Sequence, residues 1–114
     1  AEILREGPPK LTAEEIEDRR YMISEMIDDL REPRSRHELN ASGARLFGEL
    51  GDFYCRSRGG WTGHGKGLLK RIKSQDPVLA RRYSEAFDQL FQHGQPAMVI
   101  TMAEELLAPT VVAV

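Results

Sequence analysis

The stretch that decides the fold reads SRHELNASGARLFGELGDFY, from Ser35 to Tyr54. Ser35 and Glu38 have the spacing of a capping box, in which each side chain satisfies a free backbone N–H at a helix start. Large apolar residues then recur at helical spacing: Leu39, Leu46, Phe47, Leu50, Phe53 and Tyr54. The stretch therefore predicts a long helix with one apolar face, which Gly59-Gly60 ends.

Small residues interrupt this helix: Ala41, Ser42, Gly43, Ala44, Gly48 and Gly51. A glycine inside a helix costs up to about 1 kcal/mol relative to alanine. Several of them in one helix predict that another helix packs closely against it.

A helix is also predicted before this stretch. Thr12 and Glu15 form another capping box, and Pro33 ends the helix. Its apolar positions are Ile16, Ile23, Ile27 and Leu30. Residues 1–11 contain Gly7-Pro8-Pro9, which cannot continue a helix, so we expect a linker there.

Three more helices are predicted after the stretch. A short one, following a glycine-rich loop, carries Leu68, Leu69 and Ile72. Asp76 is an N-cap with Pro77 at the first helical position, and Gly94 caps the end of that helix. Pro96 begins the last helix and Pro109 closes it.

These elements predict an all-α fold, an antiparallel up-and-down bundle of four long helices plus one short helix after the glycine-rich loop. Residues 12–109 form the single domain, and residues 110–114 are an apolar tail.

Length and charge limit the class of protein. The 114 residues suit one domain, and a net charge of −2 means that attraction to an anionic partner has to be local. No run of about 18 apolar residues is present, so we expect no membrane partner. Cys55 lies on an apolar helical face, which favours a buried thiol in a reducing, cytoplasmic compartment.

The glycine-rich loop, residues 60–67, lies within a basic segment. Six basic residues and no acidic one occur between positions 56 and 73: Arg56, Arg58, Lys66, Lys70, Arg71 and Lys73. Glycines let a backbone approach a ligand, and a helix start offers N–H groups to an anion, so Gly65-Lys66-Gly67 could hold a phosphate. The alternative is that Trp61 packs in the core and the charges form a solvated face.

Two known motifs come close to this loop. Gly60-x-x-x-x-Gly65-Lys66 nearly matches a P-loop, but Gly67 replaces the Ser or Thr that holds Mg²⁺, and no strand is predicted before it. Arg58 and His64 have about the spacing of a ribonuclease pair in helical HEPN proteins, where the pair lies on a helix. Glycines lie on and beside this segment here, so we do not expect one helix to carry both residues. His64 is therefore interpreted as a hydrogen-bonding loop residue.

No metal site is predicted. The three histidines and Cys55 lack metal-ligand spacing. Asp28 and Asp29 are interpreted as partners of Arg31, Arg34 or Arg36 rather than as cation ligands.

Several segments, in order and spacing, carry a resemblance to a known family. They are residues 60–66 (GWTGHGK), 76–83 (DPVLARRY) and 103–109 (AEELLAP), with further similarity over 21–33 and 46–54. Together they resemble the C-terminal helical, HEPN-like, substrate-binding-type domain of bacterial nucleotidyltransferase-like proteins. In that family a mixed α/β catalytic domain precedes the helices and holds Mg²⁺ through an Asp-x-Asp/Glu pair after a Gly-Ser or Gly-Gly turn. No such pair follows Gly59-Gly60, so the resemblance implies that Mg²⁺ and nucleotide belong to a separate catalytic domain.

The resemblance implies a non-catalytic accessory domain that contacts the phosphate of a nucleotide or nucleic acid and adjoins a catalytic nucleotidyltransferase domain. The candidate phosphate-binding residues are Arg58, Trp61, His64, Lys66, Lys70 and Arg71. One alternative is a partner-binding or homodimerising module that uses the apolar tail and the glycine-rich helix. Another is a ribonuclease that uses Arg58 and His64.

Overall fold

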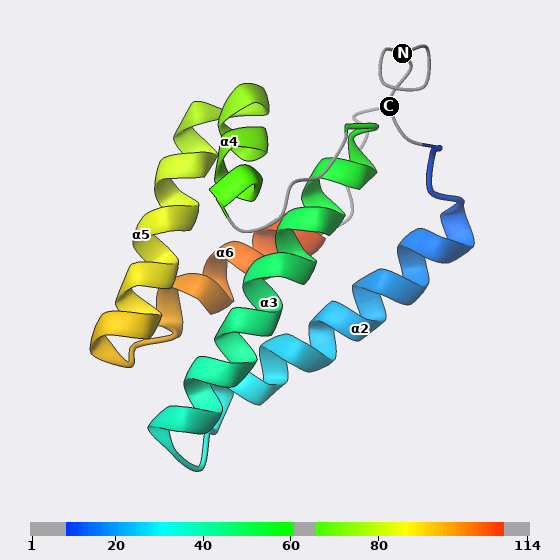
Figure 1. The fold of residues 1–114 in the computed structure, drawn as a ribbon. Coiled ribbons are helices and arrows are strands. Elements are labelled where there is room, and N and C mark those ends of the chain that lie inside the picture. Colours follow the sequence, from blue (N-terminus) through cyan, green and yellow to red (C-terminus); the bar gives the residue numbers. More distant parts are fainter. Residues whose placement is uncertain (1–8, 61–65, 109–114) are drawn as a thin grey trace.

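The computed structural model describes residues 9–60 and 66–108, and all regular secondary structure in these ranges is helical. Figure 1 shows the helices, which are α2 (Ala13–Arg31), α3 (Arg36–Ser57), α4 (Lys66–Gln75), α5 (Pro77–His93) and α6 (Ala97–Leu107). The predicted all-α class is confirmed. Three helices are long, whereas α6 has 11 residues and is nearly as short as α4 with 10. None of the described helices is long and apolar enough to cross a membrane.

The helix ends lie where the local signals predict them. Thr12 Oγ1 accepts from the N–H of Glu15 at 3.1 Å, and Glu15 Oε1 accepts from the N–H of Thr12 at 3.0 Å. Ser35 Oγ accepts from the N–H of Glu38, which is one half of the other predicted box. Gly94 ends α5 in the left-handed conformation, with φ of 66°.

The predicted close approach to α3 occurs at two of its glycines. A Cβ on Gly51 would lie 2.5 Å from Cδ2 of Leu68 in α4, and one on Gly43 would lie 2.6 Å from Cδ2 of Leu90 in α5. Gly48 is exposed, and no described atom lies within 4 Å of its Cβ position. Gly43 and Gly51 are eight residues apart, so they share one helical face, and the α4–α5 pair packs against that face.

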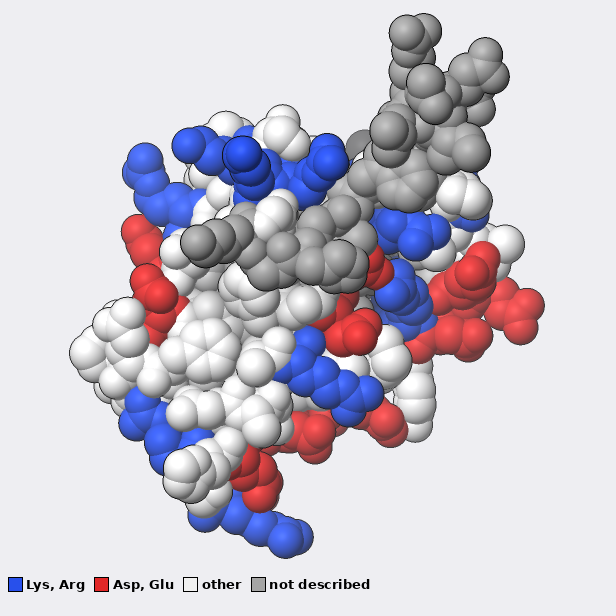
Figure 2. Space-filling view, viewed as in Figure 1, with Lys and Arg blue, Asp and Glu red and all other residues white. Residues whose placement is uncertain are grey.

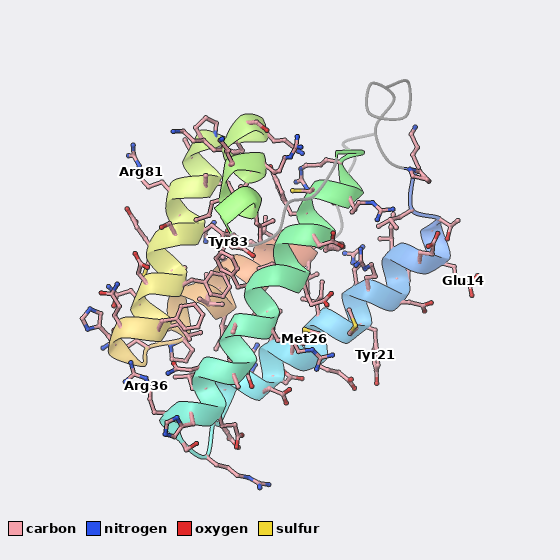
Figure 3. All side chains as sticks on the ribbon, viewed as in Figure 1. Glu14, Tyr21, Met26, Arg36, Arg81 and Tyr83 are labelled. Atoms are coloured by element: carbon pink, nitrogen blue, oxygen red, sulfur yellow. The ribbon has the colours of Figure 1, made fainter. Side chains whose placement is uncertain are left out.

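Phe47 lies midway between these glycines and joins an aromatic cluster. Its ring meets those of Tyr83 and Phe87 edge-on, with centroids 5.3 and 5.1 Å apart. Tyr83 is fully buried, and its hydroxyl donates to the backbone carbonyl of Phe47. Figure 3 shows Tyr83 pointing from α5 toward α3.

Helices α2 and α6 complete the core. Helix α2 packs against α3 and α6, and α6 also packs against α5. Ion pairs join these helices at their edges: Arg19 with Asp52 at 2.6 Å, Arg31 with Glu104 at 2.7 Å, and Arg82 with Glu105 at 2.5 Å. Together with the contacts of α4 and α5, this packing means that the core takes residues from all five described helices.

Replacing Gly51 by alanine tests the close contact between α3 and α4. The new Cβ would overlap Leu68, which is buried and cannot move into solvent. We expect Gly51→Ala to lower the free energy of unfolding by about 1–2 kcal/mol despite the better helix propensity of alanine. Gly48→Ala is the matched control and should raise stability by up to about 1 kcal/mol. Urea unfolding followed by circular dichroism measures both, and equal stability of the two variants would contradict the packing.

The buried phenol of Tyr83 predicts a loss of stability in alkali. Burial raises the pKa of Tyr83 above its ordinary value of 10.0. The unfolded chain therefore loses this proton first, so the stabilisation is complete below about pH 10 and falls above it, by at most about 1.4 kcal/mol per pH unit. Tyr83→Phe should be about 1 kcal/mol less stable at neutral pH, since it lacks the hydrogen bond. Unfolding measured from pH 7 to 11 should show this difference shrinking above pH 10; a constant difference would argue against the raised pKa.

Candidate phosphate-binding site

A groove of about 600 Å³ between α4 and α5 brings basic side chains together over apolar ones. Its lining residues are Leu69, Lys70, Lys73, Pro77, Ala80 and Arg81. Lys70 and Lys73 are three residues apart and share one side of α4, while Arg81 extends outward from α5 (Figure 3). Figure 2 shows Lys and Arg side chains gathered over the end of the molecule where α4 meets α5. Among the described residues, no carboxylate lines the groove.

The local sequence explains why these side chains meet. A single residue, Asp76, joins the two helices, and its carboxylate accepts from the N–H of Leu79 at 3.0 Å. Its own N–H donates to the carbonyl of Ile72 at 2.8 Å, so the chain reverses within one residue. Leu68 and Ile72 are buried. Because these two residues face the core, Lys70 and Lys73 are left on the exposed side of α4.

Arg58 and Arg71 do not line the groove that contains Lys70. Arg58 caps the end of α3, and its guanidinium lies 4.0 Å above the centre of the Tyr54 ring. Burial and the charge of Asp52 raise the pKa of the Cys55 thiol, and the charges of Arg71 and Arg58 oppose this. Both charges therefore act on Cys55, and neither arginine lines the α4–α5 groove.

The predicted site residues thus divide into separate groups. Lys70 lines the groove, whereas Arg58 lies at the end of α3, and Arg71, although next to Lys70 in α4, does not line the groove. Trp61 and His64 lie outside the described residues, as does the side chain of Lys66, whose backbone begins α4. The sequence-based site set omitted Lys73 and Arg81. Their signals were the i,i+3 spacing from Lys70 and the one-residue connection at Asp76, which places the start of α5 beside α4.

The structure also bears on the other motifs. A helix, α3, precedes the glycine-rich loop, so the strand that a P-loop needs is replaced by a helix, as predicted. Arg58 follows the last residue of α3, and Gly59 has φ of 75°, so this helix does not continue toward His64. Asp28 pairs with Arg31 at 3.1 Å, as interpreted from the sequence. In residues 9–60 and 66–108, no three His, Cys, Asp or Glu side chains form a metal-binding group.

Comparison with known proteins finds no matching family model, and no curated protein or solved structure of significant similarity. The nucleotidyltransferase resemblance therefore stays a prediction, and functional inference relies on the geometry of this chain.

The burial of Cys55 predicts slow thiol chemistry. The residue is fully buried and its thiol pKa is raised, so the reactive thiolate is both scarce and shielded. We expect a disulfide reagent at neutral pH to modify the folded chain at least about 100-fold more slowly than the chain unfolded in urea. The rate is read from reagent absorbance, and equal rates in the two states would contradict the burial.

Proposed function

We propose that this chain is a non-catalytic, substrate-binding-type helical domain that holds the phosphate of a nucleotide or nucleic acid in the α4–α5 groove. The observation that carries the proposal is that Lys70, Lys73 and Arg81 line one groove whose described lining contains no carboxylate. Arginine and lysine are the side chains that most often bind phosphate in proteins. In a chain of net charge −2, this grouping is a local attraction for an anion.

The floor of the groove supports a ligand with an organic part. Leu69, Pro77 and Ala80 line the groove between the cations. A sugar or base could cover these side chains while its phosphate meets the charges. Binding sites commonly combine apolar walls with a few polar groups that orient the ligand.

We further propose that the helices form an antiparallel up-and-down bundle to which α4 is an addition. In Figure 1, α2 and α5 run downward and α3 runs upward, which supports the proposal, whereas α6 runs mainly from left to right behind α3. This arrangement fits the HEPN-like domain that the sequence resembles. The parent protein would then be nucleotidyltransferase-like and cytoplasmic, and its catalytic domain would supply Mg²⁺ and nucleotide.

The alternative of a partner-binding module has less support. Gly43 and Gly51, the small residues that would let a second chain approach α3, are covered by Leu90 and Leu68 of the same chain. The apolar tail, the other part of that interface, lies outside the described residues. The ribonuclease alternative would use Arg58, whose guanidinium lies over Tyr54 at the end of α3.

Binding of ATP and of a short single-stranded RNA, measured at several salt concentrations, tests the proposal. We expect affinity to fall as salt rises, because phosphate contacts release counterions. Lys70→Ala combined with Arg81→Ala should weaken binding at least about tenfold and reduce the salt slope for RNA by about 1.4, or 0.7 for each lost contact.

Arg34→Ala combined with Arg45→Ala is the matched control, since both side chains are exposed and the net charge changes equally. This control should bind like the unchanged chain. Equal weakening in both double variants would show that binding depends on net charge and not on the groove, which would contradict the proposal. The absence of any salt-sensitive binding would also refute it.

A further inference from the structure

A second basic pocket lies where the segment leading into α2 meets the end of α3. It has a volume of about 340 Å³ and shares no lining residue with the α4–α5 groove among the residues described. Its lining residues are Lys10, Leu11, Ile16, Arg56, Ser57, Arg58 and Gly59. Three of these residues are cations and none of them is acidic, so this pocket also favours an anion.

Within the described residues, no acidic side chain forms an ion pair with a cation of this pocket. Among the described residues, the ion pairs involve Arg19, Arg20, Arg31 and Arg82, and none involves Lys10, Arg56 or Arg58. The pKa of Glu15 is lowered, mainly by its hydrogen bonds with Thr12. The positive charge of Arg56 contributes to this lowering. The carboxylate of Glu15 accepts from the N–H of Thr12 at the start of α2, and it forms no ion pair with Arg56.

Arg56 has hydrogen-bonding capacity that the described part of the protein does not use. Its Nη2 donates to the carbonyl of Pro9 at 3.1 Å, which holds the guanidinium in place. Its Nε is buried and has no hydrogen-bond partner within residues 9–60 and 66–108. Buried polar groups are rarely left without a partner, so each such atom calls for an explanation. Because Nε is shielded from solvent, an acceptor oxygen of a ligand would reach it only if the Arg56 side chain moved.

A second cleft of about 610 Å³ is adjacent to the basic pocket, since Ile16, Ser57 and Arg58 line both. Phe53, Leu106 and Leu107 give this second cleft apolar surface. Glu105 also lines it and pairs with Arg82 at 2.5 Å. Arg20 lines this cleft as well, and its guanidinium donates to the carbonyl of Leu107. The second cleft therefore combines apolar side chains with charged groups that already have partners within the described residues.

We propose that these adjacent pockets bind a phosphomonoester whose organic part is apolar or aromatic. The phosphate lies among Lys10, Arg56 and Arg58, and the organic part extends toward Phe53 and Leu106. This site is independent of the α4–α5 groove, since the two have separate linings.

Titration with phenyl phosphate and with inorganic phosphate, followed by ¹H–¹⁵N NMR, tests the proposal. The Nε–H resonance of Arg56 is the direct reporter, and its loss in Arg56→Lys identifies it. We expect both anions to shift this resonance, and phenyl phosphate to bind about tenfold more tightly because its ring buries apolar surface. Lys10→Ala combined with Arg58→Ala should weaken binding of either anion at least about tenfold.

Two control variants separate this site from general attraction and from the groove. Arg34→Ala with Arg45→Ala, and Lys70→Ala with Arg81→Ala, should leave phenyl phosphate affinity and the Arg56 shift unchanged. The proposal is overturned by an Arg56 resonance that neither anion moves, or by equal weakening in all three double variants. Equal affinity for the two anions would overturn the assignment of the apolar part.

Discussion

The close contact between the small-residue face of α3 and the α4–α5 pair is the constraint on which the rest of the structure depends. Gly43 and Gly51 leave room for Leu90 and Leu68, and Phe47 fills the space between them against Tyr83. Because interiors are close-packed, few alternative placements of α4 and α5 would satisfy all three contacts. The hydroxyl of Tyr83, which donates to the carbonyl of Phe47, adds a directional bond to this packing.

This packing also determines where charge appears on the surface. Once Leu68 and Ile72 face the core, helical geometry leaves Lys70 and Lys73 outside, next to the start of α5. The other side of the end of α3 presents Arg56 and Arg58 to the segment before α2. A chain with a small net negative charge thus carries two separate basic pockets at the end of α3 and the α4–α5 connection.

Local signals predicted most of the fold. Thr12 with Glu15, Asp76 with Pro77, and Gly94 each act within one helical turn, so the sequence alone suffices for the helix ends. The glycines of α3 predicted close packing, yet only contact with another helix distinguishes Gly51 from the exposed Gly48. The site was harder to predict for the same reason. Lys70 and Arg81 line the same groove although they belong to different helices, whereas Arg58 lines another pocket. Proximity in the sequence therefore did not predict which basic residues share a pocket.

The packing of α4 and α5 on α3 is tested by a NOESY spectrum of the folded chain, read at the Hα protons of Gly51 and Gly43. Protons within about 5 Å give cross-peaks, and the side chains of Leu68 and Leu90 approach these glycines well inside that range. We expect strong cross-peaks from Gly51 Hα to the methyl groups of Leu68, and from Gly43 Hα to those of Leu90. Absence of both, in a chain whose α3 remains helical, would contradict this packing.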